Sequence, residues 1–260
     1  MTVECGSLEF AHARLHARHG QRVDEAGWRG IEMLRGLAPL LERARGTALR
    51  PWLVGITAES SPAQIESALR AHWQALVGEA AAWMPPPWQP AVAWCAVLPD
   101  LAPLQHLARN EAPPRWMMDD ARWQTLCRAE APARPATLAD GPWAALTPAW
   151  TAPRRLGEAW LAEWRRRQPH AAAYAAGDAE RALAELTRVA LDHRGAFATA
   201  APERGWLLRT ALRARLALLL RRAGLGPAAI FVHLALCALD LERLRAELLR
   251  RTLFPRWRLA

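Results

Sequence analysis

Apolar residues recur at intervals of three or four along most of the chain, the spacing that places them on one face of a helix. The first run follows Ser7, a residue type that caps helices, and Gly20 ends it. A second run begins at Asp24 and continues to Leu41 without a change of period. The pattern therefore predicts a helix from Ser7 to Gly20 and another from Asp24 to Leu41.

The rest of the chain repeats this pattern between proline-rich breaks. Ser60 or Ser61, followed by Pro62, predicts the start of a third helix, because proline suits the first turn. Met84 and three prolines interrupt the pattern, and an apolar stripe with kinks expected at Pro99 and Pro103 then runs to Leu107. Further helices are predicted at 154–168, 178–193, 203–223 and 227–254.

Residues 113–153 differ from the flanking sequence because prolines and tryptophans alternate there. A flexible linker would be rich in Gly and Ser. We therefore expect a long connection with one or two short helices, docked by its tryptophan side chains. The expected organisation is a first helical unit at 1–112, this Trp/Pro-rich connection at 113–153, and a second helical unit at 154–260.

The two units share an ordered series of short matches. Ala68-Leu69-Arg70-Ala71 corresponds to Ala211-Leu212-Arg213-Ala214, and Asp100-Leu101 corresponds to Asp240-Leu241 after a break in each unit. Such a series is typical of a duplicated helical unit. Good helix formers dominate the composition and β-formers are scarce, so the predicted fold class is all-α, with pseudo-repeated bundle units in a funnel-like arrangement.

The chain carries a formal net charge of +9, and all 34 of its basic residues are Arg. This charge is compatible with an acidic partner such as nucleic acid, an anionic membrane face or an acidic protein surface. A genome rich in G and C would produce the same Arg-for-Lys bias. Arginine clusters at 165–167, 221–222 and 250–251 could contact phosphates, but interspersed Glu residues also fit a solvated helix face.

No established catalytic motif is present, so we expect a protein that is not an enzyme and has no cofactor or metal. The sequence contains no GxxxxGK[ST] loop and no HExxH or GxSxG motif. His12, His16 and His19 share a helix face but lack a fourth ligand at suitable spacing. Asp119 and Asp120 are adjacent and do not face each other on a helix, so a helix cap is the better interpretation.

Several features favour a cytoplasmic location. The first ten residues contain Glu4 and Glu9 and no apolar core of a secretory signal. The four cysteines are far apart, which is typical of reduced thiols. The uncharged run from Ala223 to Leu239 is short for a membrane span, so we expect a buried core helix there.

Three stretches resemble the C subunit family of V/A-type rotary ATPases, called subunit d in vacuolar enzymes. Phe10–Arg18 resembles the family's opening aromatic-x-x-Ala-Arg-aliphatic-Arg helix, and Leu98–Arg109 resembles its Tyr-Asp-x-x-Asn-Leu-Lys-x-Leu-Leu-Arg element. Phe231–Arg245 is similar to its Glu-Ile-Arg-Asn-Leu-Arg helix. Pro99, Pro103, Gln105 and Arg243 depart from the family pattern, and two units stand where relatives have three, as in a diverged or shortened member.

The resemblance implies a mechanical function. It implies a central-stalk collar that binds the shaft and the membrane rotor ring on the cytoplasmic face of the inner membrane, coupling ATP hydrolysis to ion transport without binding nucleotide. Arg14, Arg18, Arg109 and Arg245 occupy the family's basic positions and would line a polar cavity or contact the shaft. Asp100 and Asp240 are their acidic neighbours, for which ion pairs within the chain are an equal alternative.

Two other functions remain open from the sequence, a general helical interaction scaffold and an Arg-rich nucleic-acid-binding protein. For the collar function, Arg14→Glu combined with Arg109→Glu should weaken assembly without unfolding the chain. Unchanged co-purification with shaft and ring subunits would contradict that expectation.

Overall fold

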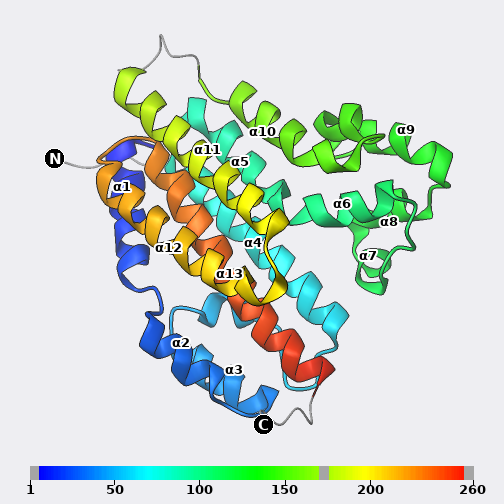
Figure 1. The fold of residues 1–260 in the computed structure, drawn as a ribbon, viewed down its shortest axis with the longest axis horizontal. Coiled ribbons are helices and arrows are strands. Elements are labelled where there is room, and N and C mark those ends of the chain that lie inside the picture. The colour runs from blue at the N-terminus through cyan, green and yellow to red at the C-terminus, as the bar shows by residue number, and fades with distance from the viewer. Residues whose placement is uncertain (1–5, 170–175, 255–260) are drawn as a thin grey trace.

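A computed structural model describes residues 6–169 and 176–254. Within these two ranges the chain forms thirteen α-helices joined by short 3₁₀ turns, and it contains no β-strand (Figure 1). The all-α prediction is confirmed.

The first three helices begin where local capping chemistry places them. Helix α1 (Leu8–Gly20) starts after Ser7, whose side chain accepts the Phe10 backbone N–H, and α2 (Glu25–Glu32) starts after Asp24. The expected single helix from Asp24 to Leu41 is wrong: it divides into α2 and α3 (Leu37–Arg45). Gly36, with φ +82°, turns the chain between them, a conformation that strongly favours glycine.

The long helix α4 (Pro62–Trp83) follows a 3₁₀ turn, η1 (Arg50–Leu53). Ser61 and Gln64 form a reciprocal capping box at its start, as the Ser61-Pro62 pattern predicts. The proline-rich break then leads through η2 (Pro86–Trp88) to α5 (Gln89–Trp94), η3 (Cys95–Asp100) and α6 (Leu101–Ala108). The expected kinked stripe is thus three short elements, with Pro99 inside the 3₁₀ turn.

Residues 113–153 contain more helix than expected. They form α7 (Arg115–Asp119), α8 (Ala121–Arg128) and α9 (Arg134–Ala139), together with η4 (Ala131–Ala133) and η5 (Ala144–Ala149). The four tryptophans of this stretch are buried, and three of them, Trp116, Trp123 and Trp143, pack against one another. The segment therefore docks through its aromatic side chains.

The second half begins with η6 (Pro153–Arg155) and α10 (Leu156–Arg166) and continues with α11 (Ala176–Thr199). After η8 (Pro202–Arg204), α12 (Gly205–Arg222) and α13 (Ala228–Leu253) lie within a residue or two of their predicted bounds. In the described residues, no helix is long and apolar enough to cross a membrane.

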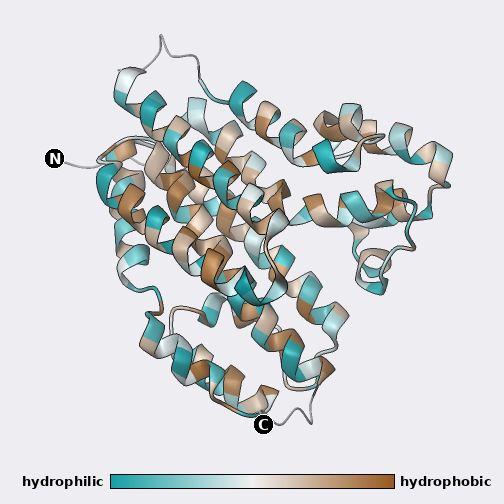
Figure 2. Ribbon diagram, in the orientation of Figure 1, coloured by the Kyte–Doolittle hydropathy of each residue, from teal (hydrophilic) through white to brown (hydrophobic). Residues whose placement is uncertain are grey.

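Helices α4 and α13 form the centre of the bundle, with α1, α5, α11 and α12 packed around them and α6–α9 projecting to one side (Figure 1). Apolar residues gather on these central helices, whereas the outer helices are mixed (Figure 2). The buried apolar residues of both halves and of the connection belong to one continuous cluster. The division into 1–112, 113–153 and 154–260, and the funnel-like arrangement, stay predictions.

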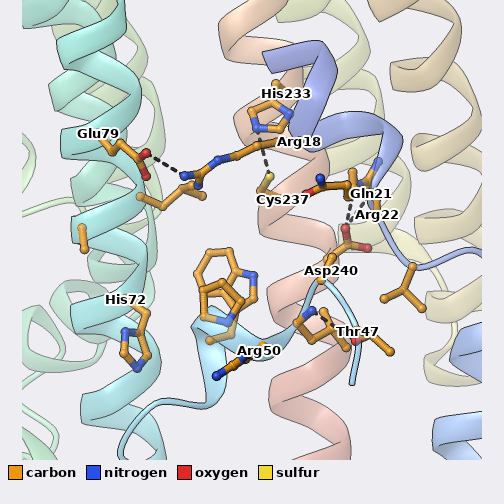
Figure 3. Close-up of a pocket in the computed structure, with 17 residues that line it drawn as sticks. Arg18, Gln21, Arg22, Thr47, Arg50, His72, Glu79, His233, Cys237 and Asp240 are labelled. Atoms are coloured by element: carbon orange, nitrogen blue, oxygen red, sulfur yellow. Dashed lines mark hydrogen bonds and ion pairs between the residues drawn. The ribbon is translucent and has the colours of Figure 1, made fainter. Parts of the chain in front are cut away.

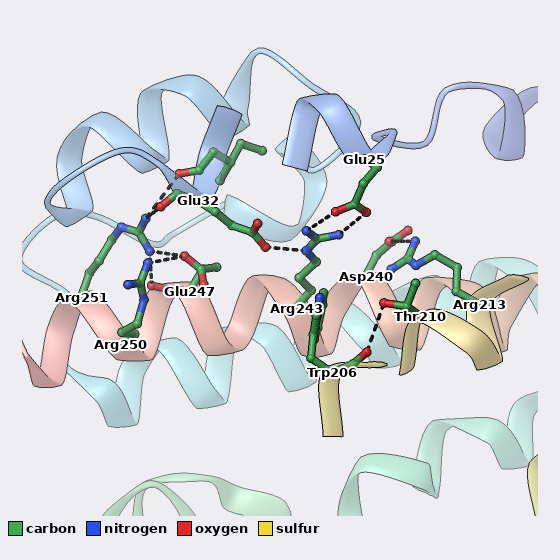
Figure 4. Close-up of polar contacts among 11 residues, drawn as sticks. Glu25, Glu32, Trp206, Thr210, Arg213, Asp240, Arg243, Glu247, Arg250 and Arg251 are labelled. Carbon is green, nitrogen blue, oxygen red and sulfur yellow. Dashed lines mark hydrogen bonds and ion pairs between the residues drawn. The ribbon is translucent and has the colours of Figure 1, made fainter. Parts of the chain in front are cut away.

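The C-terminal half of α13 binds α2 through two arginines (Figure 4). Arg243 donates to both carboxylate oxygens of Glu25 at 2.8 Å and to Glu32 at 2.6 Å, and its guanidinium lies over the rings of Trp28 and Trp206. Arg251 donates to the backbone carbonyls of Leu34, Glu32 and Ile31, near the end of α2, where a cation is favoured by the helix dipole.

Candidate functional site

A pocket of about 540 Å³ lies between α1, α4 and α13 and is closed at one end by the connection from α3 to η1 (Figure 3). Its size lies within the range of small-molecule and peptide side-chain sites. Apolar walls come from residues such as Leu49, Trp52 and Leu76, and charged groups enter from several sides. The pocket is therefore a concave site with a limited set of polar groups.

Two ion pairs cross the pocket between different helices. Arg18 of α1 donates to Glu79 of α4 at 2.6 Å, and both side chains are about half exposed. Arg22, just beyond α1, donates through Nε to Asp240 of α13 at 2.7 Å and through Nη2 to the Leu236 carbonyl at 3.1 Å. These contacts hold α1 to both central helices while their charges stay at the pocket surface.

Arg50 adds a third guanidinium at the opposite end, on η1 (Figure 3). Its side chain is exposed and has no ion-pair or hydrogen-bond partner among residues 6–169 and 176–254. Counting the charged side chains that line the pocket, three arginines face two carboxylates. The pocket thus carries an excess positive charge that an acidic group can neutralise.

His233 and Cys237 form the buried floor, one turn apart on α13, with His233 Nε2 and the Cys237 Sγ 3.6 Å apart. Burial lowers the pKa of His233 to about 3 and raises the pKa of the Cys237 thiol to about 12. Both groups are therefore neutral near pH 7, so the thiol is not the activated thiolate that nucleophilic catalysis requires. His233 Nδ1 has no hydrogen-bond partner within the described chain.

Asp240 is a wall residue that holds two further elements in place. Besides Arg22, it accepts a hydrogen bond from Arg213 of α12 at 2.6 Å. The carboxylate is thus bracketed by two guanidiniums, one from α1's end and one from α12, and it anchors both to α13. An ion pair for Asp240 was one of the two roles expected from the sequence.

Asp100 lies in a separate network outside the pocket, at the end of η3. Its carboxylate accepts from Arg70 at 3.3 Å, from Arg122 at 3.1 Å and from the Trp143 indole N–H at 3.0 Å. Burial raises the pKa of Asp100 even though these partners favour the charged form. The site joins α4, α8 and the chain around Trp143, so its contacts connect the Trp-rich segment to the bundle.

The four arginines predicted to bind partners lie in different places. Arg14 is exposed on α1 and stacks over Phe10, and Arg109 is exposed after α6 and pairs with Glu111. Arg18 lies in the pocket, whereas Arg245 on α13 pairs with Glu66 of α4. The structure therefore does not bring all four into one cavity, and their role in partner binding stays a prediction.

Four of the seven arginines in the basic clusters have an acidic partner three or four residues away. Arg166 and Arg167 both bind Glu163, and Arg250 and Arg251 both bind Glu247. Arg221 and Arg222 have no such partner in the described parts of the chain. The paired arginines fit the solvated-helix interpretation, whereas Arg221 and Arg222 leave positive charge at the end of α12.

The other sequence candidates are explained by local structure. Asp120 caps α8 by accepting the Arg122 backbone N–H at 2.9 Å. His12 contacts the Gly226 carbonyl, in the turn before α13, through Nε2 at 3.1 Å, and its ring lies 5.8 Å from that of His16. Across residues 6–169 and 176–254, no group of three or more His, Cys, Asp or Glu side chains is placed to hold a metal ion.

Sequence reasoning did not single out Arg22, Arg50, His233 or Cys237 as members of one site. The i, i+4 spacing of His233 and Cys237 was visible, but their neighbours come from α1 and η1, far away in the chain. Comparisons with family models, with curated proteins and with solved structures find no match to this chain.

Proposed function

We propose that this protein is a non-catalytic collar subunit in the central stalk of a V/A-type rotary ATPase, which links the rotating shaft to the membrane rotor ring for ion transport. The observation that carries the proposal is the convergence of two of the three resembling stretches on one pocket. Phe10–Arg18 contributes Arg18, and Phe231–Arg245 contributes His233, Cys237 and Asp240.

The remaining stretch is connected to the same helices through a chain of charges. Arg245, at the end of the third stretch, binds Glu66, and Glu66 lies 3.9 Å from Arg70. Arg70 in turn binds Asp100 in the second stretch. All three resembling segments therefore touch α4 or α13, as expected if they mark the framework of one folded unit.

The duplicated unit has support from the matching contacts. Arg70 and Asp100 correspond in the sequence repeat to Arg213 and Asp240, and both pairs form ion pairs across two elements. A chance match of short Ala, Leu and Arg motifs gives no reason for equivalent pairs to meet. Repeated helical units are the architecture that the resemblance implies.

In this proposal the pocket receives an acidic group from the tip of the shaft. Arg50 has no partner of its own, and Arg18 is half exposed, so both can contact a carboxylate without breaking a buried network. The chain would act at the cytoplasmic face of the inner membrane, where its net charge of +9 adds attraction of about 1 kcal/mol per Arg that approaches an anionic leaflet.

The first test is affinity purification of the tagged protein from solubilised membranes of its own host, followed by mass spectrometry. Recovery of rotary-ATPase head, shaft and ring subunits is the expected result. Recovery of nucleoprotein alone, or of no rotary subunit, would overturn the proposal and leave a general helical scaffold as the better interpretation.

A pair of charge reversals tests the pocket within the same experiment. Arg50→Glu removes no described ion pair, so it should lower shaft-subunit recovery at least tenfold while leaving the melting temperature unchanged. Arg128→Glu is the matched control, because Arg128 is exposed on α8, outside the pocket, and also has no described partner. Equal recovery with both variants would exclude the pocket as the shaft contact.

A further inference from the structure

Helix α12 carries a second surface that the fold itself does not use. Leu207, Ala211, Ala214 and Leu218 are all exposed, and Leu207 and Leu218 have 67% and 38% of their surface accessible. These four residues, the outer stripe, follow intervals of four, three and four. This alternation of four and three is the apolar heptad pattern by which two helices pack along a common seam.

The opposite side of α12 accounts for its packing inside the molecule. Leu216, Leu219 and Leu220 are buried there, and α12 lies along α13 and α11 on the outside of the bundle (Figure 1). The outer stripe is therefore additional apolar surface on a helix already anchored by its inner face. A rigid, anchored helix loses little conformational entropy when it binds a partner.

The charge of α12 defines the partner. The helix contains five arginines and no acidic residue. Arg209 and Arg213 turn inward to Glu242 and Asp240 of α13, and Arg215 pairs with Asp192 of α11. Arg221 and Arg222 are exposed and have no ion-pair partner in the described residues. A helix packed on the outer stripe would lie beside uncompensated positive charge at the end of α12.

We propose that the outer stripe of α12 is a docking site for an acidic amphipathic helix of another protein. Leu207 and Leu218 would contact its apolar positions, and the small Ala211 and Ala214 would allow the two backbones to approach closely. Glu or Asp residues flanking that apolar stripe would pair with Arg221 and Arg222. This inference rests on α12 alone and does not depend on the proposed ATPase function.

The two other possible occupants fit less well. A second copy of this chain would place one all-basic α12 against another, and like charges across a helix seam are unfavourable. A membrane surface favours a broad apolar face with bulky side chains, whereas the centre of this stripe consists of two alanines. Each of these occupants gives a distinct result in the test below.

The test uses a fluorescein-labelled synthetic helix of three heptads, with Leu at the a and d positions and Glu at the flanking e and g positions. Fluorescence anisotropy should show saturable binding to the full chain that weakens as salt is raised. Leu207→Asp should weaken binding at least tenfold. Met33→Asp, which makes the same charge change at an exposed apolar residue on the α2–α3 turn, should leave binding unchanged.

Several outcomes would overturn the inference. If the Leu207→Asp and Met33→Asp variants bind the peptide equally well, the outer stripe is not the site. The absence of binding at peptide concentrations up to about 1 mM would also overturn the inference. If sedimentation shows concentration-dependent dimers of the wild type, and Leu207→Asp abolishes them, the occupant is a second copy of the chain. Binding to phosphatidylglycerol vesicles without binding to the peptide would identify a membrane surface.

Discussion

Two buried carboxylates occupy corresponding positions in the sequence repeat but have different surroundings. Asp100 is 1% exposed and is enclosed by Arg70, Arg122 and the Trp143 indole. Asp240 is 6% exposed, binds Arg22 and Arg213, and forms part of the pocket wall. The same Arg–Asp pair is thus sealed in one half and open to a pocket in the other.

The segment that covers each pair accounts for the difference. In the first half the Trp-rich segment supplies Arg122 and Trp143, and the Trp143 indole that bonds Asp100 packs in turn on Trp123. In the second half the end of α1 supplies Arg22 and leaves the pocket beside it. The contact at Asp100 therefore joins the Trp-rich segment to the bundle, whereas the contact at Asp240 borders a pocket.

Removing the charge of Asp100, the sealed site, should lower the free energy of unfolding more than the other changes considered. Asp100→Asn would leave two guanidiniums around a neutral amide, and breaking a buried ion pair from one side costs about 3–5 kcal/mol of the free energy of unfolding. Urea denaturation monitored by circular dichroism measures that loss. Asp140→Asn is the control, since Asp140 is exposed and unpaired in the described chain, and it should change stability by less than about 0.5 kcal/mol. Similar values for both variants would contradict a sealed ionic site.

Acid should weaken the open site through His233. The folded chain keeps the pKa of His233 at about 3, whereas the unfolded chain has the ordinary value of 6.5. Below pH 6.5 the unfolded state therefore takes up a proton that the folded state excludes. The free energy of unfolding falls as the pH is lowered from 6.5 to about 3. We expect a loss of about 2–3 kcal/mol between pH 7 and pH 4.5 from this group.

The measurement compares the wild type with His233→Gln. Carboxylates such as Glu25, whose pKa is lowered by its hydrogen bonds to Arg243, also lose stabilising charge in acid in both proteins. Urea midpoints at several pH values should therefore fall less steeply for His233→Gln. Parallel curves would mean that His233 is not held neutral by burial.

Asp240→Asn should have the smallest effect of the three, about 1–2 kcal/mol on the free energy of unfolding. Water entering through the pocket can solvate the released guanidiniums, and Arg22 keeps its bond to the Leu236 carbonyl. The same urea experiment applies. If Asp240→Asn lowers the free energy of unfolding as much as Asp100→Asn does, water in the pocket does not compensate the lost ion pairs. The two sites would then not differ as described.

The helix starts that were predicted well depend on local chemistry. Ser7 and the Ser61–Gln64 box satisfy backbone N–H groups close to themselves in the chain, so their effect is visible in the sequence. The division of α2 from α3 was missed because the apolar period continues across it, while one glycine with positive φ redirects the backbone. Helix propensity and the spacing of apolar residues do not reveal such a turn when the helices on both sides of it bury the same kind of apolar face.

The site was less predictable because its parts are distant in sequence. The sequence indicated that Asp100 and Asp240 could pair with arginines, but it did not indicate that Arg122 and Trp143 would meet Asp100 or that Arg22 would meet Asp240. Those pairings depend on how α1 and the Trp-rich segment pack on the central helices. Only long-range packing determines which of many arginines lies beside a given carboxylate.

The bonds from α13 to α2 also set an order of events during synthesis. Arg243 binds Glu25, 218 residues earlier in the chain, and Arg251 binds carbonyls at the end of α2. Helices α1 to α3 leave the ribosome well before α13, because the two regions are far apart in the chain. The bonds between α2 and α13 therefore cannot form until α13 has been translated, and until then the surface of α2 that α13 covers is open to chaperones and neighbouring chains.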